Sequence, residues 1–128
     1  MTEEIRVVLL LIPGIIHLLP LSGLLGREKL SDLYGIPFTD PNLLILMQHR
    51  SVLFGLLGAF LVFSAFRSEL QVLAITAGLI SAASFMAIAL SIGGYNAAIQ
   101  RVVVADVVAV LCLTGAAATF LLPGSVDR

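Results

Sequence analysis

The sequence predicts an all-α membrane protein: a four-transmembrane-helix antiparallel bundle with a structured loop between the first two helices. Three observations predict this class. Of the 128 residues, 59% are hydrophobic, only 12% are charged, and the charges collect in short stretches between long apolar runs. A soluble domain is about a quarter charged, so the composition excludes most soluble enzymes. It also excludes a disordered chain, which needs low hydrophobicity. We expect one transmembrane domain over residues 1–128.

Four apolar runs are each long enough to cross the hydrocarbon layer of a membrane, which takes about 20 residues of helix. The predicted helices lie near residues 5–25, 43–66, 70–92 and 102–122. The strands of a membrane β-barrel would alternate apolar and polar residues, and these runs do not. They also lack the polar stripe of a soluble amphipathic helix. We therefore predict helix for all four runs.

The first run differs from a cleaved signal peptide. Two acidic residues and one basic residue precede it, its apolar stretch exceeds the usual 7–15 residues, and no small-residue cleavage site follows it. We expect it to be the first membrane helix. Pro13 and Pro20 flank His17 and are expected to kink this helix and to free carbonyl groups near the imidazole.

The loop over residues 26–42 is predicted to have local structure of its own. A short helix is expected through Arg27–Tyr34, and the prolines after Ile36 and Asp40 favour extended or turn geometry. The sequence 40–42, Asp-Pro-Asn, is typical of a helix start and predicts the beginning of the second long helix. The apolar residues of the loop predict that it lies on the membrane surface.

The remaining connections are shorter and place both termini on one side of the membrane. A tight turn over residues 66–70 predicts that the second and third helices are close neighbours. Gly93 and Gly94 are expected to end the third helix. Small residues recur every four positions on these two helices, which favours close helix packing. The positions are Ser51, Gly55 and Ala59, then Ala74, Gly78 and Ala82. Basic residues are balanced between the two sides, so the positive-inside rule does not decide the orientation.

Four ionisable side chains fall inside the predicted helices: His17, His49, Arg50 and Asp106. From the 1.5 Å rise per residue of a helix, all lie in the half of the bilayer nearest the long loop. Such residues are costly in lipid and therefore need a partner or a function. We expect them to form one polar cluster, with Tyr34 and Arg101 close to it. The other half of the bundle is expected to hold only Ser, Thr and small residues among its polar groups.

These residues admit a structural and a functional interpretation. Arg50 and Asp106 are candidates for an ion pair that fixes the second helix against the fourth, and Arg50 is also close enough to the interface to extend toward water. His17 is a candidate either for a hydrogen bond to a neighbouring helix or for ligand or proton binding. His49 points about 100° away from Arg50 around the helix, toward another helix or the loop.

Catalytic and metal sites are not predicted. No pair of ligand residues stands at a spacing that puts both on one helix face. Cys112 lies in the middle of an apolar helix, where desolvation keeps a thiol neutral, and no G-x-S-x-G motif is present. The net charge of −1 gives no reason to expect nucleic acid.

Four stretches carry a resemblance to a known family. They are PGIIHLLP at 13–20, LYGI at 33–36, LMQHRSVLFG at 46–55 and RVVVAD at 101–106. With these stretches the chain resembles a family of uncharacterised four-helix bacterial membrane proteins, which at longer range is similar to the DoxX-like group. The resemblance implies a multi-pass protein of the bacterial cytoplasmic (inner) membrane, with an accessory role or a link to quinone chemistry.

Proteins similar to this one are sometimes labelled phosphopantetheine adenylyltransferase. That activity needs a soluble nucleotide-binding fold with an H-x-G-H motif. Here His17 is followed by Leu18 and Leu19, and His49 by Arg50 and Ser51. We interpret the label as a misassignment.

The sequence thus supports three functional hypotheses. In the first, the protein has an accessory or ligand-binding role and the polar cluster holds a quinone or a lipid, with Arg50, His17, His49 and Asp106 contacting the head group. In the second, it is a structural subunit of a larger membrane complex. In the third, it is a proton-coupled transporter, which four helices would form only as a homo-oligomer. The lipid bilayer is the partner common to all three.

Overall fold

The computed structural model describes residues 1–123, and no strand occurs in this part of the chain. The elements in order are α1 (Thr2–Leu18), η1 (Leu19–Leu25), α2 (Arg27–Tyr34), α3 (Pro41–Ser64), η2 (Ser68–Leu70), α4 (Gln71–Ile92), α5 (Ala97–Ala118) and η3 (Thr119–Leu121), where η marks a 3-10 helix. Four of the helical segments are long and apolar enough to cross a membrane. The all-helical prediction is confirmed, and so is the short helix predicted within the long loop.

Side-chain caps set the starts of two long helices: α3 begins at the predicted Asp-Pro-Asn signal, and α5 begins earlier than predicted. The Asp40 carboxylate accepts a hydrogen bond from the Asn42 backbone N–H at 2.9 Å, which starts α3 at Pro41. The Asn96 side-chain oxygen accepts from the Ile99 N–H at 2.8 Å, which starts α5 at Ala97 and not at residue 102. At its C-terminal end, α4 stops at Gly93, whose positive φ of 68° suits glycine.

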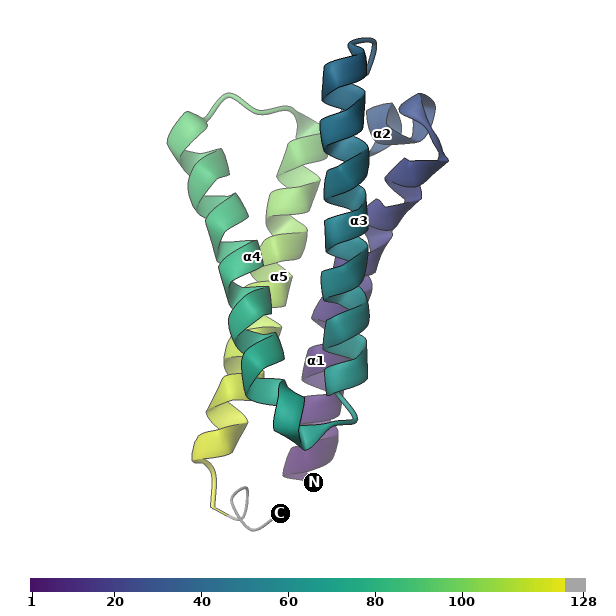
Figure 1. The fold of residues 1–128 in the computed structure, drawn as a ribbon. Helices are drawn as coiled ribbons and strands as arrows, with labels where there is room; N and C mark the ends of the chain where they lie inside the picture. The colour runs from purple at the N-terminus through teal and green to yellow at the C-terminus, as the bar shows by residue number, and fades with distance from the viewer. Residues whose placement is uncertain (124–128) are drawn as a thin grey trace.

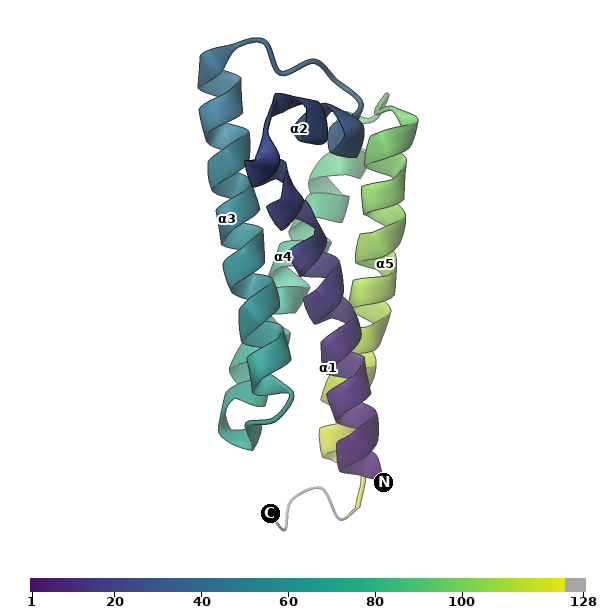
Figure 2. The ribbon, with the colours of Figure 1, turned by 90° about the vertical axis from the view of Figure 1, so that its right-hand side faces the viewer.

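The chain passes back and forth between two ends of the molecule (Figures 1 and 2). The N-terminus and the described end of the chain lie at one end, called here the terminal end, and α2 lies at the other, called the loop end. Helix α1 packs mainly against α3 and α5, and α4 packs mainly against α5. Helices α3 and α4 share a smaller contact. The prediction that these two helices are close neighbours is therefore only partly right. A tight turn brings the end of α3 next to the start of α4, but it does not make the two helices pack along their length.

Glycines explain why α3 pairs with α1. A Cβ atom at position 58 would lie 2.8 Å from the Gly14 carbonyl oxygen and 2.9 Å from the Leu18 backbone nitrogen. Both distances are far shorter than carbon contacts of about 3.5–4.0 Å. The backbones of α1 and α3 thus cross in direct contact, which only glycine at position 58 permits. The predicted small-residue stripe on this helix is shifted accordingly: Gly55 and Gly58 are buried, and Ala59 is exposed.

The interior and the exterior of the helices differ little in polarity. The main core of the bundle is formed by buried apolar side chains of all four long helices. Its members are Leu10, Leu61, Ala65, Ala74, Ile75, Leu113 and Ala116. The outward faces also carry large apolar side chains, among them Leu56, Ile80 and Leu111, each more than 60% exposed. An apolar exterior is typical of helices surrounded by lipid.

The terminal end contains a buried charge that sequence reasoning missed. Arg6 is 6% exposed, and its Nε donates to Thr119 Oγ1 at 2.7 Å while its Nη1 donates to Gln71 Oε1 at 3.4 Å. The guanidinium also lies over the Phe120 ring, 3.8 Å from its centre. The prediction that this half holds only Ser, Thr and small residues is therefore wrong. Because α1 begins at Thr2 and η3 extends the last helix, Arg6 lies inside the bundle.

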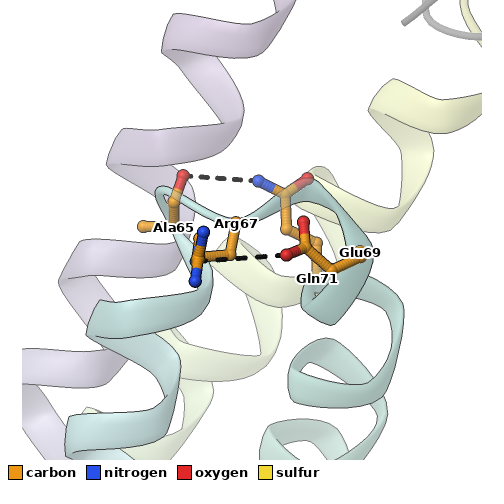
Figure 3. A network of polar contacts seen from close by, with 4 residues as sticks. All are labelled: Ala65, Arg67, Glu69 and Gln71. Carbon is orange, nitrogen blue, oxygen red and sulfur yellow. Dashed lines mark hydrogen bonds and ion pairs between the residues drawn. The ribbon is translucent and has the colours of Figure 1, made fainter.

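The turn between α3 and α4 completes this polar cluster (Figure 3). Gln71 Nε2 donates to the Ala65 carbonyl oxygen at 3.3 Å, so the same amide that accepts from Arg6 ties α4 to the end of α3. Nearby, Arg67 and Glu69 form an ion pair of 3.9 Å with both side chains more than half exposed. Exposed pairs of this kind contribute at most about 1 kcal/mol.

Candidate functional site

A cavity of about 250 Å³ lies at the loop end, between α1, η1, α2, α3 and α5. We call it the Asp106 cavity. Its lining residues are Ile16, His17, Leu19, Pro20, Asp32, Leu33, Tyr34, Arg50, Phe54, Ala98, Arg101, Val102, Ala105 and Asp106. Most of this wall is apolar. A few polar groups in a mainly apolar concave wall are typical of small-molecule sites, whose volumes begin at about 300 Å³. Five of the six predicted site residues line this cavity, four of them buried or half-buried: His17, Tyr34, Arg50 and Asp106. Arg101 also lines the cavity, with its side chain exposed.

Helix α2 forms one wall of the cavity because a residue distant in sequence holds it there. Asn96 Nδ2 donates to the Tyr34 carbonyl oxygen at 2.9 Å and to the Gly35 carbonyl oxygen at 3.3 Å. Gly35 ends α2 with a φ of 68°, and a Cβ there would lie 2.9 Å from the Asn96 amide nitrogen. Leu30, Tyr34 and Phe38 are buried as a small separate core. Asn96 thus caps α5 and anchors α2 at once.

Arg50 is held by aromatic rings and a phenol. Its Nη1 donates to the Tyr34 hydroxyl at 3.1 Å. The guanidinium carbon lies 4.6 Å from the centre of the Phe54 ring, 5.3 Å from that of Phe85 and 5.4 Å from that of Tyr34. Attraction between a cation and the faces of aromatic rings contributes about 0.5–2 kcal/mol per contact. The guanidinium therefore has a defined position between α2, α3 and α4.

Asp106 is the buried polar residue of the cavity wall for which the described residues provide no hydrogen bond. The residue is 7% exposed, and no hydrogen bond to its carboxylate occurs among the described residues. Every fully buried polar side-chain atom in this part of the chain has a hydrogen-bond partner. It follows that the Asp106 oxygens keep some surface open, and the surface beside them is that of the cavity. A buried carboxylate with unused acceptor capacity is costly unless something donates to it.

The ion pair predicted as one alternative for Arg50 and Asp106 does not form. No guanidinium nitrogen of Arg50 lies within 4.0 Å of a carboxylate oxygen of Asp106, which is the distance limit for an ion pair. The Arg67–Glu69 pair, at 3.9 Å, meets this limit. The physical reason is that Tyr34 and the ring of Phe54 hold the guanidinium elsewhere. Both side chains nevertheless line the same cavity, so a cation with spare N–H groups and an unpaired acceptor contribute to one wall.

Both nitrogens of His17 have protein partners. Nδ1 lies 2.8 Å from the Pro13 carbonyl oxygen, and Nε2 lies 3.3 Å from Ser81 Oγ on α4. A carbonyl oxygen only accepts, so Nδ1 carries a hydrogen, and Nε2 of the neutral ring then accepts from the Ser81 hydroxyl. The side chain is 2% exposed and packs beside the Phe54 ring. This arrangement favours the interpretation of His17 as a hydrogen-bonding bridge between helices.

His49 does not join the cluster. Its side chain is exposed and does not line the cavity, whereas Arg50 next to it does. The helix geometry that separates neighbouring residues by about 100° accounts for this. Three residues that the sequence did not mark as candidates also contribute to the wall or hold it: Phe54, Asp32 and Asn96. For Phe54, a signal was available, because it lies one helical turn after Arg50 and so on the same face.

The Tyr34 phenol can both accept and donate. Burial raises the pKa of Tyr34 above its usual value, and the positive charge of Arg50 opposes part of this rise. The phenol therefore keeps its hydrogen at neutral pH. Its oxygen accepts from Arg50, while its own O–H has no acceptor among the described residues. Arg50 and Tyr34 therefore have N–H and O–H groups beside the cavity that donate to no described residue.

No group of three or more His, Cys, Asp or Glu side chains in the described part of the chain is placed to hold a metal ion. The lining of the cavity provides hydrogen-bonding groups and apolar surface. Comparison with family models, curated proteins and solved structures gives no match to this chain.

Proposed function

We propose that this chain is a multi-pass protein of the bacterial cytoplasmic membrane that binds a small amphipathic molecule in the Asp106 cavity. The four long helices would cross the bilayer as an antiparallel bundle. The DoxX-like resemblance of the sequence remains a prediction and is consistent with such an accessory role. The observation that carries the proposal is Asp106: a carboxylate about nine-tenths buried, without a donor, beside a cavity that also holds a guanidinium.

Membrane insertion is supported by the outer surface. Each candidate span buries at most a third of its most apolar window inside the bundle. The rest of each helix would otherwise expose large apolar side chains to water, at about 25 cal/mol for each Å². Lipid removes this cost. The two ends of the bundle also differ: at the terminal end Arg6 donates to two buried side chains, whereas at the loop end no described residue donates to Asp106.

Ligand binding is supported by the balance of groups in the cavity wall. Leu19, Val102 and Ala105 provide apolar surface for a tail or a ring, and Arg50 and Tyr34 provide donors near the Asp106 acceptor. A quinone or a lipid combines an apolar body with a compact polar head, which is the shape this wall suits. Because the cavity is smaller than a whole lipid, we expect it to hold the head and first carbons while the tail extends between helices.

The experiment compares two substitutions of alanine by phenylalanine. Ala105→Phe fills the cavity, and Ala83→Phe adds the same ring to the exposed side of α4. Each protein is extracted gently from membranes, and the organic molecules that it retains are identified by mass spectrometry after denaturation. We expect one species that is stoichiometric in the wild type and in Ala83→Phe but lost in Ala105→Phe, and its spectrum separates a quinone from a lipid. Equal retention by both variants, or no stoichiometric species in folded wild type, would refute the proposal.

A further inference from the structure

We infer that the Asp106 cavity selects a neutral head group that donates and accepts a hydrogen bond at one atom, such as an alcohol or a phenol, over a head group that only accepts. Of the two ligand classes proposed above, this inference favours a lipid with a hydroxyl head over an oxidised quinone, whose carbonyl oxygens only accept. The inference rests on the proposed function and concerns the same cavity. It makes Asp106 a specificity-determining residue, with Arg50 and Tyr34 as its complements.

The first step is the charge of the cavity. Its two deeper charges are the Arg50 guanidinium and the Asp106 carboxylate, and they are of opposite sign. At the mouth, the exposed Arg101 and Asp32 again have opposite signs. His17 contacts the Pro13 carbonyl and the Ser81 hydroxyl, neither of which is charged, and burial without a counter-ion among the described residues favours the neutral ring. A bound cation or anion would therefore leave one charge of this wall uncompensated in a low-dielectric environment, whereas a neutral head group does not.

The second step is the inventory of unused groups. Arg50 has five N–H donors, of which one reaches Tyr34. The Tyr34 O–H is unused, and so are the acceptor sites of Asp106 among the described residues. Donors alone would be satisfied by a ketone or an ether. Asp106 is different, because an ionised carboxylate only accepts, so the ligand itself must bring a hydrogen.

The third step is the cost of the wrong ligand. Any molecule that fills the cavity removes the Asp106 carboxylate from contact with water. If the ligand has no donor, a buried charged acceptor is left without a hydrogen bond, and sites of this kind discriminate strongly against the analogue that lacks the hydrogen. A hydroxyl accepts from Arg50 or Tyr34 and donates to Asp106. We therefore expect an alcohol to bind at least about tenfold more tightly than the matching ketone.

The experiment uses three probes of similar size, 2-decanol, 2-decanone and the methyl ether 2-methoxynonane, with the full chain in lipid nanodiscs. The unfolding temperature is followed at increasing mole fraction of each probe in the bilayer, because a ligand that binds the native state stabilises it by mass action. We expect 2-decanol to act at about a tenth or less of the mole fraction that the ketone and the ether require. The ether separates the need for a donor from the shape of a carbonyl group.

Two variants assign the effect to the carboxylate. Asp106→Asn replaces an acceptor by an amide that can also donate, so the preference for the alcohol should fall to about twofold or less. Glu69→Gln makes the same chemical change on an exposed side chain outside the cavity and should keep the full preference. If Asp106→Asn does not fold, the comparison of the three probes on the wild type still tests whether the cavity prefers a ligand that donates. Equal action of all three on the wild type overturns this inference but leaves ligand binding intact, whereas the absence of any shift overturns both.

Discussion

The crossing of α1 and α3 gives the sharpest test of the packing. Gly58→Ala adds one methyl group, whose carbon would lie 2.8 Å from the Gly14 carbonyl oxygen and 2.9 Å from the Leu18 backbone nitrogen. Neither atom belongs to a flexible side chain, so the two helices must separate. Overpacking of this kind costs about 1–3 kcal/mol, and the better helix propensity of alanine returns up to about 1 kcal/mol. Because both close atoms belong to the backbone, we expect the upper part of this cost range, and so a net loss of about 1–2 kcal/mol in the free energy of unfolding.

Gly115→Ala is the matched control, since it makes the same change within α5. A Cβ at position 115 would meet the Leu9 side chain at 3.4 Å, an ordinary contact. This variant should be as stable as the wild type, or more stable by about 0.5–1 kcal/mol. Unfolding of both proteins is followed by circular dichroism in mixed micelles with increasing SDS. If Gly58→Ala matches Gly115→Ala in stability, the backbone contact between α1 and α3 is not tight, and the reasoning fails.

Three other contacts can be tested. Arg6→Met removes the cation of the terminal polar cluster and should lower the free energy of unfolding by about 1–3 kcal/mol in SDS titrations. Arg67→Met breaks an exposed ion pair and should lower it by less than about 1 kcal/mol. Equal losses in the two variants would contradict the burial argument. Asn96→Asp keeps the acceptor that caps α5 but loses the donor to α2, so hydrogen exchange should quicken in α2 amides alone; unchanged exchange there would show that the amide does not anchor α2. Burial raises the pKa of Tyr34, so the native state holds this proton more tightly than the unfolded state. The stability linked to it is present below about pH 10 and is lost as pH rises through the folded-state pKa. Tyr34→Phe should flatten the loss of stability above pH 10, and an unchanged profile would contradict this.

The number and type of helices could be predicted from the sequence because they depend on local properties. Apolar runs of sufficient length specify the four helices, and the Asp-Pro-Asn sequence marks the start of α3. The pairing of helices could not be predicted in the same way. It depends on which faces meet, and a stripe of small residues gives a face only approximately: Gly58 lies at the contact with α1, while Ala59 is exposed.

The candidate site shows the same division between local and distant effects. Helix rise correctly placed Arg50 and Asp106 near one depth, because depth follows from residue number alone. Their lack of direct contact could not be predicted, since it depends on Tyr34, which the loop brings to the guanidinium. Likewise, Asn96 anchors α2 across 61 and 62 positions of sequence. No periodicity signals such a hydrogen bond.

The burial of Arg6 has a consequence for the synthesis of this protein. Its closest hydrogen-bond partner, Thr119, lies 113 positions later in the sequence. At about 5–20 residues per second, a ribosome needs several seconds or more to reach it. In the first part of that interval Arg6 has neither partner, because Gln71 lies 65 positions later, and until the end of it Thr119 is missing. A lone charge of this kind is tolerated at a water interface and is costly inside lipid. The N-terminal turn of α1 should therefore stay at the membrane surface until the last helix arrives, and the terminal end of the bundle should be the last part to close.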